Sequence, residues 1–519
     1  MKKLPVIHPF LFAIFPVLFL FAHNVNRVSF SEILLPTAIV LGFTLLLLLL
    51  FRLILRDSKK AGIVVSILLI LVFSYGHVFN LIRGEGEVGY LHRYLLPPWG
   101  MLFICSAYFI IRTRRNLHNF TNVLNIVATF LVVISLINIG YNFKSNVTSQ
   151  DIKSTRNIEI NSIDSRKPDT LRDIYYIILD RYASTSTLKE IYNFDNSEFI
   201  DYLSDKGFYR ASKSTANYLL TDHSLASSLN MEYINYLSDR MGEESRNLGP
   251  LFEMMQDYKV WRFLKSKGYK FIHFGSWWRG TKRNKYADTN FKLAHSLSEF
   301  SQFLDVLYKT TMFHPIDWKL DITGFASTWR RQQWKRILQE FDELAEVPNI
   351  KEPTFVFAHM LIPHDPYVFN RNGNFVTEEE ERKRTKIVNY VDQLIFTNKK
   401  LKILIDKLLS DSELSPIIVL QADEGPYPQR YSADVLNFNW EQARKEELRE
   451  KMRILNAYYL PGVDKDILYP SITPVNSFRL IFNLYFDTNF ELLPDENYAF
   501  VDGRHLYKFF NITDKVKYQ

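Results

Sequence analysis

The stretch Ile174-Tyr-Tyr-Ile-Ile-Leu179, followed at once by Asp180, predicts a strand that is buried on both faces and ends in a carboxylate. A helical apolar stripe runs through residues 385–409. Strands of this kind that alternate with helices indicate a mostly parallel sheet covered on both faces. The sequence therefore predicts an α/β domain whose chemistry lies beyond the carboxyl ends of its strands. Three further apolar runs predict strands at Lys270 to Phe274, Thr354 to Ala358 and Ile417 to Leu420.

The first 145 residues are of a different kind, because about five apolar stretches there approach the roughly 20 residues that cross a membrane. Lys and Arg gather before the first stretch and after the second and fourth, which places these connections in the cytoplasm. With an odd number of spans, the chain after Tyr141 emerges outside the cytoplasm. A cleaved signal peptide is the competing interpretation of the first stretch. The stretches are Pro5 to Ala22, Ile33 to Leu55, Ala61 to Ile82, Pro97 to Ile111 and Val123 to Tyr141.

These patterns divide the chain into a transmembrane domain of about five helices (1–143), a polar linker (144–172) and an extracytoplasmic catalytic domain (173–519). We expect a multi-pass protein of the cytoplasmic (inner) membrane. The first 149 residues hold 13 Lys and Arg against 4 Asp and Glu, so the net charge of +7 belongs to this part. The larger part is near neutral, which argues against a nucleic-acid partner. The one cysteine, Cys105, excludes an internal disulfide and a cysteine-based zinc site.

Three carboxylates follow two of the predicted strands: Asp180 after the first, and Asp423 and Glu424 after Ile417 to Leu420. Carboxylates brought together at strand ends repel one another unless a cation or a proton lies between them. An all-oxygen set suits a hard divalent ion, so we expect one Mn²⁺, Mg²⁺ or Ca²⁺. The alternative is structural: Asp180 caps a helix, and residues 423–426 form an ordinary turn.

A hydroxyl and two imidazoles complete the candidate site. Thr221 precedes a run of small and apolar residues that predicts a helix, and a hydroxyl at a helix N-terminus is favourably placed next to a phosphate. The alternative for Thr221 is an ordinary helix cap. His359 and His364 flank Pro363 in a loop after a predicted strand, where a held imidazole can contact phosphoryl or sulfuryl oxygens.

The order of these pieces resembles the alkaline phosphatase and sulfatase superfamily: strand-Asp, a Thr-bearing segment, His-x-Pro-aromatic, and a late strand followed by Asp-x-Gly. Together with the apolar N-terminal part, it is similar to lipoteichoic acid synthases and lipid A phosphoethanolamine transferases. The resemblance implies that Thr221 is the nucleophile and that Asp180 and Asp423 are metal ligands. It implies a contact between His364 and the transferred group. A threonine nucleophile, in a chain without the Cys/Ser-x-Pro/Ala-x-Arg pattern of sulfatases, favours phosphoryl transfer.

Two residues depart from the pattern of the family. Glu424 stands where the transferases usually have His and calcium-dependent sulfatases have Asn, and oxygen ligation by Glu424 keeps it in the expected metal set of Asp180, Thr221, Asp423 and Glu424. Arg181 stands where Gly is frequent, and its guanidinium is expected to contact substrate oxygens or to pair with a carboxylate. Four further residues are candidates for substrate binding: His359, Trp277, Arg279 and His505.

The expected function is a membrane-bound, metal-dependent phosphotransferase with a phosphothreonine intermediate. Its donor is a phospholipid in the lipid bilayer, the transferred group is of phosphoglycerol or phosphoethanolamine type, and the acceptor is an envelope glycan or lipid. One alternative is a sulfatase-like phosphodiesterase that hands the group to water. The alternative from another class is a non-catalytic protein that binds envelope glycans or acts as a scaffold.

Overall fold

The computed structural model describes residues 5–25, 28–83, 91–147, 165–166, 168, 170–291, 302–320, 325–435 and 437–518. The chain divides into two compact units. The first comprises residues 1–148 and 297–329, and the second comprises residues 149–296 and 330–519. Most of the predicted linker, 144–172, lies outside the described residues, so its boundaries stay a prediction.

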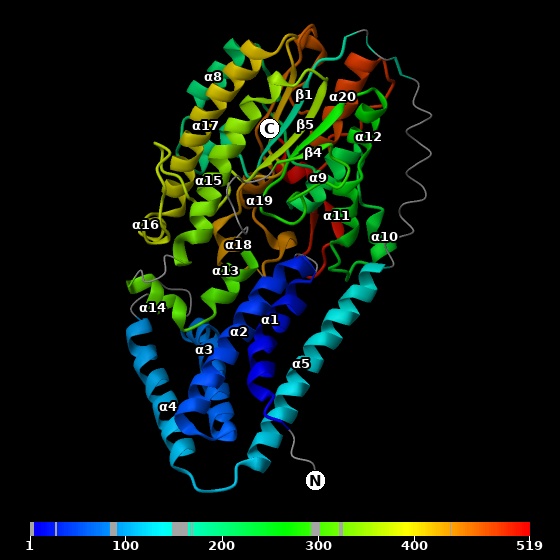
Figure 1. Cartoon of the computed structure of the whole chain (residues 1–519). Coiled ribbons are helices and arrows are strands. Elements are labelled where there is room, and N and C mark those ends of the chain that lie inside the picture. Colours follow the sequence, from blue (N-terminus) through cyan, green and yellow to red (C-terminus); the bar gives the residue numbers. More distant parts are fainter. Residues whose placement is uncertain are drawn as a thin grey trace. The chain divides into compact units, whose positions relative to one another are not determined.

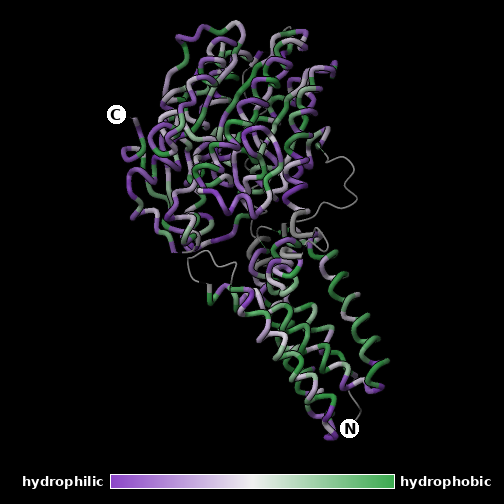
Figure 2. Tube along the Cα trace, turned by 90° about the vertical axis from the view of Figure 1, so that its left-hand side faces the viewer, coloured by the Kyte–Doolittle hydropathy of each residue, from purple (hydrophilic) through white to green (hydrophobic). Residues whose placement is uncertain are grey.

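The first unit is built on five apolar helices, which Figure 2 shows as largely hydrophobic along their length. Many large apolar side chains of these helices are exposed. Leu53, for example, is 77% exposed. Four described segments are long and apolar enough to cross a membrane: Phe30–Leu55, Ser58–Ile82, His92–Arg112 and His118–Tyr141. The first helix is shorter, with 17 residues. The five are α1 (His8–Asn24), α2 (Leu34–Leu55), α3 (Ser58–Arg83), α4 (His92–Arg112) and α5 (His118–Val147).

A segment from the second half of the chain also belongs to this unit. Helices α13 (Gln302–Lys309) and α14 (Phe313–Leu320) follow each other there, and Phe303 and Leu307 of α13 pack into the same apolar cluster as residues of α1, α2 and α3. The backbone between α13 and α14 bonds to α3 directly. The N–H of Gly76 donates to the carbonyl of Thr310 at 2.9 Å, and the N–H of Met312 donates to the carbonyl of Val72 at 3.0 Å.

Gly76 is what permits this close approach. In an undisturbed helix the groups of Val72 and Gly76 would pair with each other, yet here both bond to residues 310–312. A Cβ built on Gly76 would lie 2.6 to 2.8 Å from backbone atoms of Thr310, which is too close for any side chain. The segment 302–320, here called the insert, is therefore held to α3 through backbone contacts that are possible because Gly76 has no side chain.

The second unit contains a seven-stranded sheet in the order β2-β7-β6-β1-β5-β3-β4. The central strand β1 (Ile174–Leu179) pairs in parallel with β5 (Thr354–Met360) and with β6 (Ile417–Gln421). Strand β3 (Lys270–Phe274) also runs parallel to β5, whereas β7 (Asn456–Tyr459) is antiparallel to β6. The predicted mostly parallel sheet is confirmed. The remaining strands are β2 (Tyr209–Arg210), β4 (Thr289–Asn290), β8 (Tyr498–Phe500) and β9 (Phe509–Asn511), of which the last two form a separate pair.

Helices cover both faces of this sheet, as Figure 1 shows, with α8 and α17 on one side and α9, α12 and α20 on the other. Helix α17 (Lys386–Asp411) is the long helix expected at residues 385–409. The other helices of eight or more residues described here are α8 (Ser197–Asp205), α9 (Thr221–Asn230), α11 (Gly249–Gln256), α12 (Lys259–Ser266), α15 (Phe325–Ala345), α19 (Lys445–Met452) and α20 (Pro474–Phe486). The short helices are α7 (Thr185–Glu190), α10 (Leu237–Met241), α16 (Glu378–Arg382), α18 (Gln429–Ala433) and α21 (Thr513–Val516).

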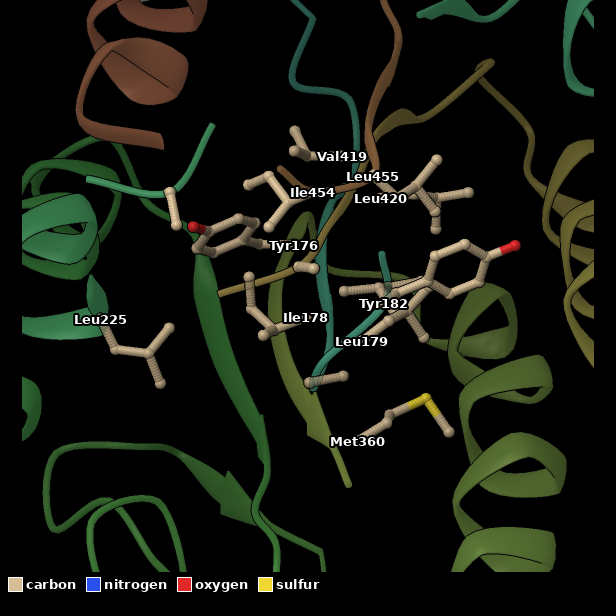
Figure 3. Packing of buried hydrophobic residues seen from close by; sticks show 14 of the residues in the cluster. Tyr176, Ile178, Leu179, Tyr182, Leu225, Met360, Val419, Leu420, Ile454 and Leu455 are labelled. Carbon is tan, nitrogen blue, oxygen red and sulfur yellow. The ribbon is translucent and has the colours of Figure 1, made fainter. Parts of the chain in front are cut away.

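Strand β1 lies at the centre of the core, and all six of its residues are fully buried. Its side chains alternate between the two layers: Figure 3 shows Tyr176 and Ile178 toward Leu225 of α9, and Leu179 on the opposite side near Met360. The hydroxyl of Tyr176 donates to the Gln421 side chain at 2.6 Å, so the one polar atom of this ring is satisfied. Burial on both faces is the physical reason for the continuous apolar run in the sequence.

One buried carboxyl of the second unit, that of Glu340, has an oxygen, Oε1, without a hydrogen-bond partner. Glu340 of α15 is 1% exposed, and the nearest cation is Arg336, whose Nη1 lies 4.0 Å from Glu340 Oε1. Burial raises the pKa of Glu340 to about 8, although Arg336 acts in the opposite direction.

We expect Gly76→Ala to destabilise the first unit, because the new methyl group collides with the backbone of Thr310 and pushes the insert away from α3. Overpacking of this kind costs about 1–3 kcal/mol. The apparent melting temperature of the detergent-purified protein should fall by several degrees. Gly42→Ala is the matched control, since a Cβ on Gly42 of α2 meets no atom within 4 Å. Equal melting temperatures for the two variants would contradict the role of Gly76.

The raised pKa of Glu340 predicts a pH dependence of stability. Because the folded state holds this proton up to about pH 8 and the unfolded state releases it near 4.5, wild-type stability should decline as pH rises between these values. Glu340→Gln should remove that part of the decline. The measurement is the melting temperature across this pH window, with the exposed Glu343→Gln as control; parallel curves for wild type and Glu340→Gln would refute the assignment.

Candidate functional site

The carboxyl ends of β1, β5 and β6 bring three sequence-distant residues to one place. Asp180 directly follows β1, His359 is the penultimate residue of β5, and Asp423 lies two residues beyond β6. Strand β1 pairs with both neighbours in parallel, and the N–H of Asp180 donates to the Met360 carbonyl at 3.0 Å. The parallel order of these three strands therefore places the three side chains at the same edge of the sheet.

Asp180, His359 and Asp423 form a buried group that could hold a metal ion, since one ligand atom from each lies within 4.8 Å of the others. All three are at most 2% exposed. His359 Nε2 lies 3.4 Å from Asp180 Oδ2. His359 Nε2, Asp180 Oδ1 and both carboxylate oxygens of Asp423 are buried without a hydrogen-bond partner. Buried polar atoms without partners are costly, and these converge, so the residues fit a bound cation.

A hydrogen bond fixes the orientation of His359. Its Nδ1 lies 2.7 Å from the hydroxyl of Thr281, which in turn lies 3.0 Å from the Ser276 hydroxyl. The edge of the Trp278 ring packs against the imidazole, with the ring centroids 6.0 Å apart. Because Nδ1 is occupied, Nε2 is the nitrogen that faces the two acids. Support of this kind is typical of histidines that bind metals.

The two acids differ in their electrostatic surroundings. Burial alone would raise the pKa of Asp180, but His364, His359 and Arg181 outweigh it and hold that pKa below its usual value. Burial raises the pKa of Asp423 well above its usual value, and the charges of Asp180 and Glu424 add to the rise. Two buried carboxylates this close do not both ionise readily without a nearby cation.

Thr221 is the first residue of α9, where the sequence places it at a helix N-terminus. The preceding Leu220 is the cap residue of this helix, and no side chain caps it, so the hydroxyl of Thr221 is not used as a helix cap. That hydroxyl lies beside Asp423 and opposes the rise of its pKa, without forming a hydrogen bond of good geometry. The structure thus brings Thr221 to the acidic group.

Glu424 has different partners from the neighbouring Asp423. Its Oε1 accepts from Lys451 Nζ at 2.7 Å and lies 3.4 Å from Arg181 Nε, so it lies in an ion pair beside the ligand group of Asp180, His359 and Asp423. Burial lowers the pKa of Lys451 to about 8, while Glu424 acts in the opposite direction. Lys451 lies in a charged helix, and its sequence context is typical of a solvated face, so nothing in the sequence indicates this contact.

Arg181 bridges several of these groups. Its guanidinium lies over the Tyr427 ring at 4.3 Å, pairs with Asp365 and lies 3.9 Å from the nearer oxygen of Asp180. Its φ of 62° falls in the left-handed region, which glycine adopts more readily than other residues. Arg181 thus pairs with carboxylates, and its expected contact with substrate oxygens stays a prediction.

The remaining predicted residues lie around this centre at different distances. His364 has a side chain 14% exposed and bonds to the backbone of Asp365. Trp277 packs edge-on against His364, with centroids 6.4 Å apart. Arg279 lies over the Phe252 ring at 5.3 Å. His505 contacts Asp502 at 2.8 Å and Glu244 at 3.0 Å, so its described ion pairs are with other acids.

No protein-family model matches the sequence, and a search of curated proteins finds no match. Among solved structures, the chain resembles the C-terminal periplasmic domain of EptC from Escherichia coli, with 12% identity and a TM-score of 0.43 over 69% of this chain and 96% of that one.

It also resembles the integral membrane lipooligosaccharide phosphoethanolamine transferase A (EptA) from Neisseria meningitidis, with 11% identity and a TM-score of 0.41 over 92% of this chain and 95% of that one. An alkaline phosphatase superfamily protein from Vibrio parahaemolyticus matches with 12% identity and a TM-score of 0.38 over 66% of this chain and 74% of that one. The chain is thus similar in structure to membrane phosphoethanolamine transferases.

Proposed function

We propose that this protein is a membrane-bound, metal-dependent phosphotransferase. It moves a phospho-alcohol group from a phospholipid to an envelope glycan or lipid through a phosphothreonine at Thr221. The observation that carries the proposal is the convergence of Asp180, His359 and Asp423, with buried unpartnered ligand atoms, next to a hydroxyl at a helix N-terminus.

In the first half of the reaction, the Thr221 oxygen attacks the phosphorus of the lipid head group. The bond from phosphorus to the diacylglycerol oxygen breaks, and the proton lost by Thr221 is balanced by the one that diacylglycerol gains. In the second half, an acceptor hydroxyl displaces Thr221 and restores its hydroxyl. We expect His364, whose side chain is 14% exposed, to donate a proton to the departing oxygen.

The chain itself supplies much of the electrostatic support for this chemistry. The N-terminus of α9 presents backbone N–H groups beside Thr221, which favours a phosphoryl group there. Asp180, His359 and Asp423 would hold the divalent ion, which neutralises charge on phosphoryl oxygens. The imidazole in this set favours Mn²⁺ or Zn²⁺ over Mg²⁺ or Ca²⁺. Arg181 lies close enough to the acids to orient a substrate oxygen.

The membrane helices suit this reaction because they confine the enzyme to the surface that contains its lipid donor. Four described helices are long and apolar enough to cross the bilayer. The Lys and Arg residues around residues 52–60 and 112–115 favour a cytoplasmic location for these connections. We infer that the domain with Thr221 faces the outside of the cytoplasmic membrane.

The direct test is release of diacylglycerol from labelled phosphatidylethanolamine and phosphatidylglycerol by the full-length protein in nanodiscs. Thr221→Ala should lower the rate at least about 1,000-fold, because it removes the attacking atom. Mass spectrometry of quenched wild-type protein should find a phospho-alcohol adduct on Thr221. Ser224→Ala, which changes another hydroxyl of α9, should stay within about threefold.

The fate of the transferred group separates the candidate reactions. Label that passes from the lipid into isolated envelope lipids or glycans supports transfer, whereas label found only as free phospho-alcohol identifies a hydrolase. Full diacylglycerol release by Thr221→Ala would overturn the proposed nucleophile.

Asp423→Asn should separate stability from activity. In chelator-treated protein at neutral pH, the substitution replaces a buried carboxyl whose charged form is disfavoured by burial and by Asp180, so it should not lower the melting temperature. In the presence of Mn²⁺ or Zn²⁺, the same variant should lose activity and the thermal stabilisation that the ion gives to wild type. Differential scanning fluorimetry measures both effects, with the exposed Asp342→Asn as control. Wild-type stabilisation of Asp423→Asn by the ion would exclude Asp423 from the ligands.

A further inference from the structure

The pair of Glu424 and Lys451 has no part in the reaction described above, yet it lies against the centre. Lys451 is fully buried in α19, where a lysine is normally solvated. Its ammonium contacts Glu424 Oε1 at 2.7 Å and the Gly425 carbonyl at 3.1 Å, and lies 3.4 Å from the centroid of the Tyr427 ring. These three contacts match the three N–H bonds of an ammonium group.

Gly425 allows the pair to form. Its N–H donates to the carbonyl of Lys451 at 2.7 Å, which draws the end of α19 onto the loop after β6. A Cβ on Gly425 would lie 2.2 Å from the carbonyl oxygen of Glu450 and 2.9 Å from that of Lys451. The glycine of the Asp-Glu-Gly motif thus serves to place a lysine from a distant helix beside the carboxylates.

The buried charges around Asp180 and Asp423 balance when one divalent ion is bound. The carboxylates of Asp180, Asp423 and Glu424 are each at most 2% exposed, and Lys451 is buried with them. One lysine against three carboxylates leaves two negative charges, which a single divalent ion neutralises. Arg181 pairs mainly outward, with the half-exposed Asp365. Without Lys451, three buried carboxylates would surround the ion, and Glu424 would keep only its longer contact of 3.4 Å with Arg181 Nε.

Resting on the proposed function, we propose that Lys451 is the cation that the chain itself provides beside this centre. It neutralises Glu424, holds it out of the ligand set, and so limits the site to one exchangeable divalent ion of moderate affinity. Glu424 Oε2 is buried without a partner, and it is the atom that would reach for an ion if the lysine were removed. Lys451 and Glu424 are therefore positioning residues that act on the ion through charge.

The test is a double-mutant cycle read out by metal binding. Full-length protein in detergent is stripped with chelator and titrated with Mn²⁺, and separately with Zn²⁺, by isothermal calorimetry. Wild type should bind one equivalent. Lys451→Met should bind at least about tenfold more tightly or take up a second equivalent, because it frees a carboxylate. Glu424→Gln should bind at least about tenfold more weakly, because it leaves an unbalanced ammonium near the ion.

The double variant Lys451→Met/Glu424→Gln tests whether Glu424 is a metal ligand, even if a single variant fails to fold. It should bind one equivalent within about threefold of the wild-type affinity, since the neutral pair replaces a balanced one. A loss of tenfold or more in the double variant would show that Glu424 is itself a ligand and overturn the inference. Glu447→Gln, which alters a carboxylate of α19 that pairs with Arg430 and Arg444, is the control and should change nothing.

Further outcomes separate this inference from the proposed function. If wild type binds one equivalent that Asp180→Asn abolishes, while all members of the cycle bind equally, the role of Lys451 is overturned and the proposed function stands. If wild type binds neither ion, both are overturned.

Discussion

The repulsion between Asp180 and Asp423 is the constraint on which the second unit depends. The fold places both carboxylates beyond adjacent parallel strands, and both are buried. Such an arrangement costs free energy that the surroundings must offset. His359, Arg181 and Lys451 supply part of the compensation, and the unpartnered oxygens of Asp423 lie where a bound cation could supply the rest. A destabilising pair that the structure maintains in this way is typical of a functional site.

Rigid elements hold the groups around this pair. Asp180 and His359 lie at the ends of buried strands, and Thr221 begins a helix whose residues are almost all buried. The Thr281 hydroxyl orients His359, and Gly425 admits the backbone that carries Lys451. Arg181 accepts a left-handed backbone conformation, which aligns its guanidinium between Tyr427 and the acids. Pre-organisation of this kind lowers the cost of assembling the site when a substrate arrives.

The apolar helices and the insert at 302–320 raise a separate structural point. An apolar stretch that crosses a membrane can be read from composition, because lipid imposes the same length and polarity on every such helix. The insert has no such signature, since α13 and α14 are short and carry charged residues. Their place in the first unit depends on the packing of Phe303 and Leu307, on two backbone hydrogen bonds to α3 and on the missing side chain of Gly76, and the last two leave no periodic pattern in the sequence.

The sequence by itself determined the apolar helices, the mostly parallel sheet and the acids at its strand ends. Burial on both faces requires continuous apolar runs, and these runs and their ends are visible in the sequence. It also located Thr221 at a helix start. Only the tertiary structure decided that His359 joins Asp180 and Asp423, and that Glu424 pairs with Lys451. These partners come from separate strands, loops and helices, so their distances depend on the packing of the whole domain. A charge on a helix looks the same in a sequence whether it meets water or a buried carboxylate.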